Sequence, residues 1–558
     1  MKWKIFLLIA VISAAFYANS FHNSFHFDDQ HFIVENTYIR DIRNIPSFFV
    51  SPKYLSFEKA FTSHYRPLLI TSYAVNYALG GLQPAGYHSV NLMFHVGSAF
   101  LVYLILQAML FRDEHKYPPP RFIIPIATAL IFAVHPFNSE VVNYITARSS
   151  VMCSFFYLLS FYFWTRFRSQ EGSYFYIISL LAFILAILTK EIAITLPFML
   201  FLHDFYFLRG SLRRYLAYLP YVLLVIVPYL AYRIMVYGHI VGGTRPYMQN
   251  MLTQTTVLLK YIQLMFLPFG LTIEHDIKLT GTILNGTVIV SILLLLLVIA
   301  SAYVLFRLGR EWRIVSFFIL WFFITLLPTT VIPLNAILQE NRGYLGGIVF
   351  AVIAGVVISR IKRIIVLPSL IILIIVFSFL TVQRNIVWRN DLSLWNDAVA
   401  KSPLSARAHD NLGLAWMGIK KYDLALEEFN KTLEIHPQYY LAYYNAGVIY
   451  QLQGDLERAR WAYEESLKIS PGYFRSYYNV GIVYKKMGAL DKAIASYEKA
   501  IALDPRHPFV YNNLGVVLID KGEFKKAEAV FIRAIGINPR YEKAYYNLGN
   551  VYFRAKEY

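Results

Sequence analysis

The pattern of hydrophobic positions divides the chain into two parts. Residues 1 to about 382 consist mainly of long apolar runs, whereas the chain from about residue 384 onward follows amphipathic helices with regular punctuation. A helix needs roughly 17 apolar residues to cross a bilayer, and eleven runs approach or exceed that length. These predicted spans are 5–20, 88–110, 122–135, 150–165, 174–189, 191–207, 215–235, 283–306, 314–330, 344–359 and 364–382. The sequence therefore predicts an all-α protein whose residues 1–382 form a polytopic membrane domain.

The second part contains an internal repeat of 34 residues. Its glycines recur at Gly413, Gly447, Gly481, Gly515 and Gly549, and prolines, alanines and aromatic residues keep the same step. This is the period of the tetratricopeptide repeat (TPR), a pair of antiparallel helices. We therefore predict a TPR α-solenoid over residues 383–558, which opens on a half repeat. Its units are expected at about 406–439, 440–473, 474–507, 508–541 and, in part, 542–558.

Charge in the first part predicts its orientation. Loops with an excess of Lys and Arg lie on the cytoplasmic side of a membrane, and the eleven spans leave every second loop basic. The basic residues are Lys2, Lys4, Arg112, Lys116, Arg121, Arg166, Arg168, Arg209, Arg213, Arg214, Arg307, Arg310, Arg313, Arg360, Lys362 and Arg363. Residues 251–268 are also apolar, but a span there would reverse the alternation, so we expect a helix that lies on or dips into the outer face. The N-terminus is therefore predicted to be cytoplasmic and the TPR domain extracytoplasmic.

The first apolar segment has a second interpretation. Two lysines, an apolar stretch and the sequence YANS also fit a cleaved signal peptide. Both interpretations send the residues that follow, including Asp28 and Asp29, to the outer face. The sequence ends without a retention signal of the KDEL type, which favours a prokaryotic plasma membrane over an endoplasmic reticulum.

Composition supports a membrane protein and excludes other classes. Of the 558 residues, 57% are hydrophobic and only 15% are charged, against roughly 25% in an ordinary soluble domain. The net charge of +18 is not accompanied by a basic patch interleaved with base-stacking aromatics, so we predict no nucleic-acid partner. The single cysteine, Cys153, rules out an internal disulfide.

Unusual polar residues gather in the predicted outer loops and turns. They include Asp28, Asp29, His31, Arg66, Glu140, Arg148, Lys190, Glu191, Glu340 and Arg342. Charges at membrane depth are costly and usually functional. For Lys190 and Glu191, which interrupt a long apolar stretch, the alternative is that they only form the turn and pair with each other.

These residue types suit the transfer of a sugar from a lipid phosphate. A polyprenyl phosphate is already a good leaving group, whereas a hydroxyl acceptor needs a carboxylate to take its proton as it attacks. Arginine or lysine can stabilise the charge on the departing phosphate. Asp28 or Asp29 would be the base. Because adjacent residues of an extended segment face opposite sides, we expect only one to face the acceptor, while the other positions it, binds a metal or holds the loop. The plainer alternative is a solvated pair of acids.

A divalent metal ion is an open alternative for the same loop. His22, His26 and His31 are close in sequence to the two aspartates. Zinc usually takes a tighter ligand set, whereas magnesium or manganese can use one or two carboxylates. We therefore predict no dedicated metal site, and the sequence contains no Gly-rich phosphate loop, nucleophile elbow or HExxH motif.

Several motifs resemble those of a known enzyme family. FDDQHF resembles the FDE-x-HF loop of protein O-mannosyltransferases, membrane enzymes of the GT-C glycosyltransferase superfamily. A closer similarity, over nearly the whole chain, is to the transmembrane and tetratricopeptide-repeat (TMTC-type) O-mannosyltransferases and their prokaryotic relatives. The matching stretches are YRPLLITSYAVNYALGGLQPAGYHSVNLMFH (65–95), HPFNSEVVNYITARSS (135–150), LTKEIAITLP (188–197) and ENRGYL (340–345), followed by the repeats.

The resemblance implies a GT-C-like fold, a dolichyl- or undecaprenyl-phosphate sugar as donor and a protein hydroxyl as acceptor. It assigns catalysis to the first acidic residue of the loop, here Asp28, and places Glu140, Glu191, Lys190 and Arg342 on charged family positions. Where the family often has an acidic residue, this chain has Ser149 and Ser150. We predict a catalytic set of Asp28, Asp29 and Glu140, a donor-phosphate set of Lys190, Arg342, Arg148 and Arg66, and a supporting set of His31, Glu191 and Glu340.

One asparagine occupies the same position in every TPR unit. These residues are Asn411, Asn445, Asn479, Asn513 and Asn547. They fall on the first helix of each unit, which lines the concave surface of such solenoids. A side-chain amide can donate to and accept from an extended peptide without reading its sequence. We predict that they bind peptide; the alternative is that asparagine is simply a common consensus residue there.

Together these patterns predict a membrane glycosyltransferase. It would move a sugar, with mannose as a candidate, from a polyprenyl-phosphate donor to a hydroxyl group of a protein that the TPR domain recruits. Two alternatives remain open at this point. One is a non-catalytic, membrane-anchored TPR scaffold, and the other is a glycosyltransferase that acts on a lipid or polysaccharide.

Overall fold

The computed structural model describes residues 2–51, 54–55, 65–111, 122–208, 216–237 and 245–555. In these residues the chain is helical and contains no β-strand, which confirms the predicted fold class. The chain divides into two compact units, Met1–Asp397 and Ala398–Tyr558, and the division falls inside α16 (Asp391–Lys401). The predicted cytoplasmic charges in 112–121 and 209–214 lie outside the described residues.

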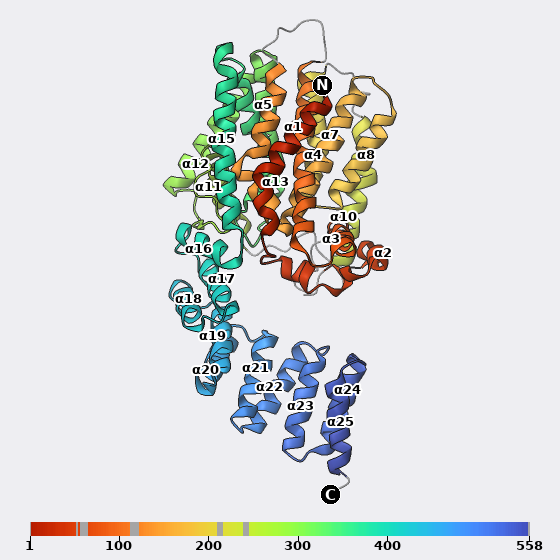
Figure 1. Cartoon of the computed structure of the whole chain (residues 1–558), viewed down its shortest axis with the longest axis vertical. Coiled ribbons are helices and arrows are strands. Elements are labelled where there is room, and N and C mark those ends of the chain that lie inside the picture. The colour runs from red at the N-terminus through yellow and green to blue at the C-terminus, as the bar shows by residue number, and fades with distance from the viewer. Residues whose placement is uncertain are drawn as a thin grey trace. The chain divides into compact units, whose positions relative to one another are not determined.

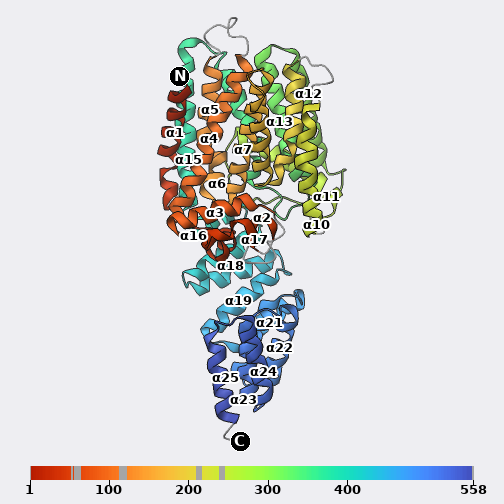
Figure 2. The ribbon, with the colours of Figure 1, turned by 90° about the vertical axis from the view of Figure 1, so that its right-hand side faces the viewer.

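Long helices run side by side through the first unit (Figure 1). Helices at the predicted spans are α1 (Lys2–Tyr17), α4 (Pro84–Leu110), α5 (Ile123–Val134), α7 (Arg148–Arg168), α8 (Tyr174–Ile187), α9 (Leu196–Phe207), η12 (Tyr221–Ile226) with α10 (Val227–Tyr237), α12 (Gly286–Arg307), α13 (Arg310–Val331), α14 (Ile348–Ile358) and α15 (Arg363–Val387). Figure 2 shows α1 and α15 on one side of this unit and α12 on the other. The central helices bury aromatic side chains such as Trp164 and Trp321, whereas α12 and α15 expose many Leu, Ile and Val residues. Broad apolar faces of this kind suit contact with lipid.

Six of the described helices are long and apolar enough to cross a membrane, which makes this a membrane protein. They are Lys2–His22, Pro84–Leu110, Leu216–Met235, Gly286–Arg307, Arg310–Val331 and Ile364–Val387. A seventh span results if α5 and Pro136–Asn143 are counted together as one element bent by 53°. The remaining helices at predicted spans are either too short or not apolar enough to cross a membrane alone; these are α7, α8, α9 and α14. The same is true of α11 (Tyr247–Phe266), the helix predicted at the outer face. The total number of crossings and the orientation stay predictions.

Short helices connect the long ones and carry most of the predicted site. After α1 come η1 (Ala18–His22), η2 (Gln30–Val34), η3 (Thr37–Arg40), η4 (Ile42–Asn44), α2 (Ile45–Val50) and α3 (Pro67–Gly80). Further along the chain lie η8 (Pro136–Asn138), α6 (Ser139–Asn143), η9 (Ile145–Ala147), η10 (Glu191–Thr195) and η13 (Glu340–Gly343). Prolines begin α3, α4 and η8, where a missing N–H costs nothing. In Figure 1, α2 and α3 lie at the end of the unit opposite the N-terminus.

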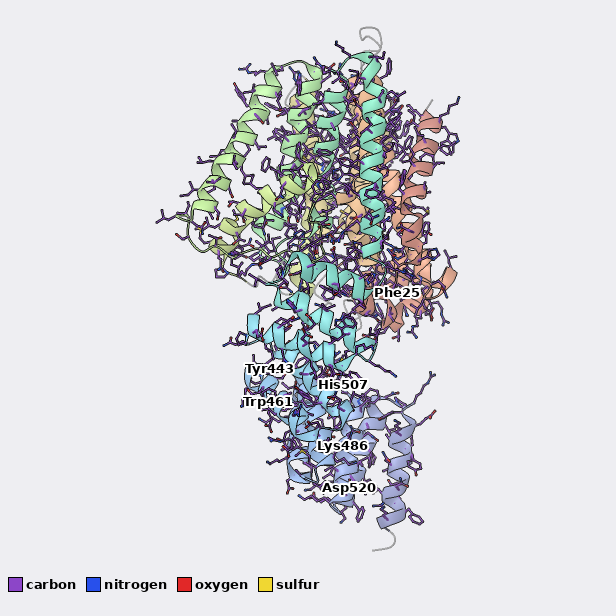
Figure 3. All side chains as sticks on the ribbon, turned by 60° about the vertical axis from the view of Figure 1, so that its left-hand side comes forward. Phe25, Tyr443, Trp461, Lys486, His507 and Asp520 are labelled. Carbon is purple, nitrogen blue, oxygen red and sulfur yellow. The ribbon has the colours of Figure 1, made fainter. Side chains whose placement is uncertain are left out.

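The second unit consists of antiparallel helix pairs with the predicted period. The pairs are α17 (Ala406–Gly418) with α18 (Tyr422–Ile435), α19 (Tyr440–Gln453) with α20 (Leu456–Ile469), α21 (Phe474–Lys486) with α22 (Leu490–Leu503) and α23 (Pro508–Asp520) with α24 (Phe524–Ile537), followed by α25 (Glu542–Ala555). Glycine allows the close crossing, because a Cβ atom on Gly481 would lie 2.7 Å from the Tyr497 ring. Tyr443 and Trp461 meet across α19 and α20 with ring centroids 5.9 Å apart (Figure 3).

One buried carboxylate in this unit makes its stability depend on pH. Asn445 donates to Asp410 Oδ1 at 3.0 Å. Burial raises the pKa of Asp410 to about 7, while the hydrogen bonds from Asn445 and Tyr439 lower it. Because the folded-state pKa exceeds the ordinary value near 4, the protonated acid is favoured in the folded state. Its contribution to stability is therefore complete below about pH 4 and is lost as the pH rises toward 7.

We expect Asp410→Asn to stabilise α17 and α19 at pH 8 by roughly 2 to 4 kcal/mol, since each pKa unit corresponds to about 1.4 kcal/mol. At pH 4 the variant and the parent chain should be nearly equal. Hydrogen exchange of these two helices in the full chain measures the difference. Asp423→Asn, which removes an exposed carboxylate from α18, is the matched control and should change little. A gain that is larger at pH 4 than at pH 8 would contradict this assignment.

Candidate active site

The loop that carries the two aspartates turns sharply before Asp28. Phe27 has a φ of +44°, which is uncommon for a residue with a side chain. The chain then enters η2 directly, so the extended segment that we predicted around Asp28 and Asp29 is wrong. A turn, not strand alternation, separates the two side chains. Backbone conformations of this kind cluster at functional sites.

Asp29 is the aspartate that holds the loop. Its side chain is fully buried. Oδ2 accepts a hydrogen bond from the main-chain N–H of His26, and Oδ1 accepts one from the main-chain N–H of Thr146, both at 2.9 Å. Burial raises the pKa of Asp29 to about 7, although these donors lower it. Asp29 therefore joins the loop to η9 and is not placed to meet a substrate.

Asp28 is the half-buried aspartate of the pair. Its main-chain N–H donates to the Tyr144 hydroxyl at 3.3 Å. Burial raises the pKa of Tyr144, and the nearby charges of Asp28 and Asp29 raise it further. One turn onward, His31 Nδ1 lies 3.7 Å from Glu35 Oε2, and both side chains are partly exposed. Of the two aspartates, Asp28 is the more exposed.

A chain of polar contacts links Lys190 to Glu140. Lys190 Nζ donates to Ser150 Oγ at 2.6 Å and to Asn341 Oδ1 at 3.4 Å, and the Ser150 hydroxyl donates to Asn341 Oδ1 at 2.9 Å. The Asn341 side-chain nitrogen donates to Glu140 Oε1 at 2.6 Å, and its main-chain N–H donates to Oε2 at 3.1 Å. This network joins the turn after α8 to α7, η13 and α6. Sequence reasoning missed Ser150 and Asn341 as site residues, although both lie inside the quoted motifs.

Glu191 binds two arginines from distant segments. Its Oε2 accepts from Arg66 Nη2 at 3.0 Å, and its Oε1 accepts from Arg233 Nη1 at 3.2 Å. The interpretation in which Lys190 and Glu191 pair only with each other is therefore wrong. Arg233, in α10, was not predicted, because it lies in an apolar run that contains none of the quoted motifs.

Several positive charges surround Lys190. Lys190 lies beyond the last residue of α8, and burial lowers its pKa to about 7, with further lowering by the charges of Arg66 and Arg342 and a partial offset from Glu191. Arg342 is anchored through Nη1, which donates to the Ala336 carbonyl at 2.7 Å. The charges of Arg66 and Arg342 repel the Lys190 ammonium. An anion bound among these three cations would be attracted by all of them.

Arg148, predicted to bind the donor phosphate, is buried among protein groups. Its guanidinium lies over the ring of Tyr73, 4.9 Å from the centroid. Each of its nitrogens donates within the chain, to Asn91 Oδ1 at 2.8 Å, Asn76 Oδ1 at 2.7 Å and the Tyr87 carbonyl at 2.9 Å. These contacts fasten α7 to α3 and α4, which gives Arg148 a packing role.

Glu340 is buried at the start of η13. Its Oε1 accepts from the main-chain N–H of Thr272 at 2.6 Å and lies 3.1 Å from His275 Nε2. Its charge also acts on Glu140, so the two predicted acids are close in space. Within the part of the chain that the structure describes, no three His, Cys, Asp or Glu side chains gather as they would around a metal ion.

The recurring asparagines connect successive TPR units. Each uses its side-chain nitrogen to contact the first helix of the preceding unit, or its own first helix in the case of Asn411. The bonds are Asn411 to the Arg407 carbonyl (2.8 Å), Asn445 to Asp410 (3.0 Å), Asn479 to the Tyr444 hydroxyl (3.2 Å), Asn513 to the Tyr478 hydroxyl (3.1 Å) and Asn547 to Asn512 Oδ1 (2.9 Å). Asn411 and Asn445 are buried, whereas Asn479, Asn513 and Asn547 are half-buried, so only these three can offer an amide oxygen to a ligand. The hydrogen bonds between successive units were not predicted.

Family profiles agree with the repeat pattern of the second unit. Profiles described as tetratricopeptide repeat match residues 392–440, 428–460, 474–507 and 496–529, and one described as TPR repeat matches 517–555. Among solved structures, the chain is similar to YrrB, described as a TPR protein with an unusual peptide-binding site. The identity is 22% and the TM-score is 0.27, over 29% of this chain and 84% of that one.

Curated relatives match parts of the chain. Protein O-mannosyl-transferase TMTC4 of Mus musculus is 32% identical over 165 residues, which is 28% of this chain and 22% of the relative. Protein O-mannosyl-transferase F38B6.6 of Caenorhabditis elegans is 24% identical over 429 residues, which is 73% of this chain and 59% of the relative. The aligned regions thus span only part of these proteins. The resemblance seen in the motifs is confirmed: the chain is similar to TMTC-type protein O-mannosyl-transferases, and it has a tetratricopeptide-repeat region after its membrane helices.

Proposed function

We propose that the protein is a membrane glycosyltransferase that moves a sugar from a polyprenyl-phosphate donor to a hydroxyl group of a protein. The observation that carries this proposal is the cluster of cations around the buried Lys190 ammonium, on which the charges of Arg66 and Arg342 both act. The acidic loop and this cluster share one neighbour, because the charges of Asp29 and Arg66 both act on the Tyr73 hydroxyl. A base and an anion site at short range are what the reaction requires.

In this proposal Lys190, Arg66 and Arg342 hold the donor phosphate. Glu191 supports them by binding Arg66 and Arg233 at once. Glu140 acts through Asn341, which fixes the position of the Lys190 ammonium. Charge builds up on the phosphate as it leaves, and preorganised cations stabilise that charge without having to move.

Asp28 is proposed as the general base. The acceptor oxygen forms a bond to the anomeric carbon while the bond from that carbon to the phosphate oxygen breaks, and the phosphate leaves with the electron pair. The acceptor proton passes to the Asp28 carboxylate. Asp28 suits this role because it is partly exposed, whereas Asp29 is committed to two main-chain donors.

The TPR region is proposed to recruit the protein acceptor on the extracytoplasmic side. The half-buried asparagines Asn479, Asn513 and Asn547 carry amide oxygens, which can accept hydrogen bonds from the N–H groups of an extended chain. The relatives named protein O-mannosyl-transferases support a protein acceptor, and they make mannose the first sugar to test.

Mass spectrometry of exported proteins, with and without the gene, tests the proposal. We expect a hexose-sized increment on Ser or Thr that disappears with the gene and returns with the full chain. A chain that lacks 398–558 should restore little of it. Unchanged glycosylation after loss of the gene would favour the scaffold alternative, and loss confined to lipids or polysaccharides would favour the other acceptor class.

A further inference from the structure

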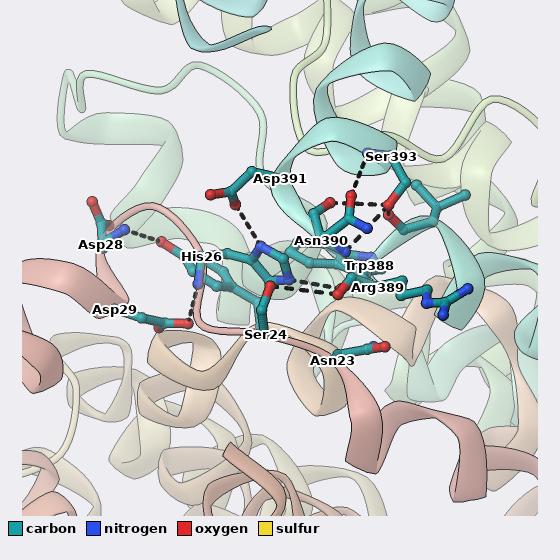
Figure 4. A network of polar contacts seen from close by, with 12 residues as sticks. Asn23, Ser24, His26, Asp28, Asp29, Trp388, Arg389, Asn390, Asp391 and Ser393 are labelled. Carbon is teal, nitrogen blue, oxygen red and sulfur yellow. Dashed lines mark hydrogen bonds and ion pairs between the residues drawn. The ribbon is translucent and has the colours of Figure 1, made fainter. Parts of the chain in front are cut away.

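The acidic loop is fastened to a segment that lies more than 350 residues later in the sequence (Figure 4). His26, fully buried, is the centre of this attachment. Its Nδ1 lies 2.7 Å from Asp391 Oδ1, in α16, and its Nε2 lies 2.7 Å from the carbonyl oxygen of Trp388, just after α15. The loop is therefore held by the junction between these two helices.

Both partners of the His26 ring are acceptors. A carbonyl oxygen and an ionised carboxylate cannot donate, so both hydrogen bonds form only when both ring nitrogens carry protons. The ring is then a buried imidazolium paired with Asp391. Such a charge-assisted hydrogen bond is stronger than a neutral one. Other charged or titratable groups near the ring are Asp29 and, on α4, His88.

The contacts of His26 continue to Asp28 through the main chain. The His26 N–H donates to Asp29 Oδ2 at 2.9 Å, and the Asp29 N–H donates back to the His26 carbonyl at 2.8 Å. Upstream, the Ser24 N–H donates to the Arg389 carbonyl at 3.2 Å. These bonds hold the loop against the residues that follow α15. Asp28 lies on the turn that the positive φ of Phe27 creates.

We propose that His26, as an imidazolium held by Asp391, is a positioning residue that keeps the Asp28 carboxylate where it can take the acceptor proton. This inference rests on the proposed function and deepens it. His26 touches neither donor nor acceptor, since it is buried and both ring nitrogens are engaged within the chain. It acts on the proton-transfer step and not on donor binding.

Steady-state kinetics of the full chain in lipid nanodiscs test the proposal. The probes are undecaprenyl-phosphate mannose, radiolabelled in the sugar, and a Ser/Thr-rich peptide. We expect His26→Gln and Asp391→Asn each to lower kcat at least tenfold while the donor KM stays within twofold. In the double variant the two introduced amides can hydrogen-bond to each other, so kcat should recover severalfold over the weaker single variant. Asp41→Asn, which removes an exposed carboxylate bonded to Arg43, is the matched control and should leave kcat unchanged.

Hydrogen exchange of residues 24–34 gives a readout that does not depend on catalysis. We expect His26→Gln to speed exchange there at least fivefold, and Asp41→Asn and Asp28→Asn to leave it unchanged. Unchanged kcat and exchange in both single variants would overturn the inference, as would a donor KM that rises as much as kcat falls. If Asp28→Asn transfers sugar normally, the general-base role of Asp28 fails, and if the parent chain transfers no sugar, the proposed function fails. In both cases the exchange rates still decide whether His26 orders the loop.

Discussion

Asp28→Asn is expected to lower kcat for sugar transfer by about a thousandfold and to leave the affinity for a polyprenyl phosphate within twofold. A positioned general base typically contributes about a hundredfold to ten thousandfold, and asparagine keeps the size of the side chain while removing its basicity. The Asp28 main-chain N–H still donates to Tyr144, so the turn is retained. Transfer to a Ser/Thr-rich peptide measures the rate, and equilibrium binding of the phosphate measures the affinity.

Asp29→Asn is the matched control within the same dipeptide. The Asp29 carboxylate accepts from the main-chain N–H groups of His26 and Thr146. Asparagine loses one of these two bonds, because an amide nitrogen cannot accept from an N–H. We expect faster hydrogen exchange around the loop and a smaller loss of kcat than for Asp28→Asn. The reverse order, with activity lost only in Asp29→Asn and the loop intact, would exchange the roles of the two residues.

The repeats could be predicted in detail because their physics is local. Each TPR unit contacts mainly its neighbours, so a short period in the sequence carries nearly all the information. Gly447 is an example, because a Cβ atom there would lie 2.8 Å from the Tyr463 ring. Every complete unit has a glycine packed in the same way against an aromatic ring of its second helix. What the period could not show is the hydrogen bond that Asn445, Asn479, Asn513 and Asn547 each make to the unit before it.

The site could be predicted only in part, because it depends on long-range packing. Charged residues in unusual places were visible in the sequence, and Lys190, Arg66 and Glu191 do come together. A neutral residue such as Asn341, which connects Lys190 to Glu140, does not stand out in the sequence as an unusual charge does. The ion pair of Arg233 with Glu191 depends on how α10 packs, which the sequence does not show. Nor could the sequence show which acid of the DD pair is buried, because that follows from the turn at Phe27.

The cation cluster leads to the second large effect, in donor binding. Lys190→Gln is expected to weaken the binding of a polyprenyl phosphate about tenfold to a hundredfold, because a hydrogen bond to a charged group contributes about 1.5 to 3 kcal/mol. Lys260→Gln, which removes a lysine from α11 that bonds to Gln263, is the control and should have no effect. Equal weakening by both substitutions would show a general response to lost charge and not a site.

The pH dependence of the same binding distinguishes a specific role for Lys190. Its pKa is about 7, and a bound phosphate would favour the ammonium and raise that pKa toward the ordinary value near 10.4. Binding above pH 7 must then take up a proton, so affinity should fall by up to about tenfold per pH unit between pH 7 and 9. Lys190→Arg stays charged throughout this range, so its affinity should be nearly constant with pH. A wild-type affinity that does not change over this interval would mean that the phosphate binds away from Lys190.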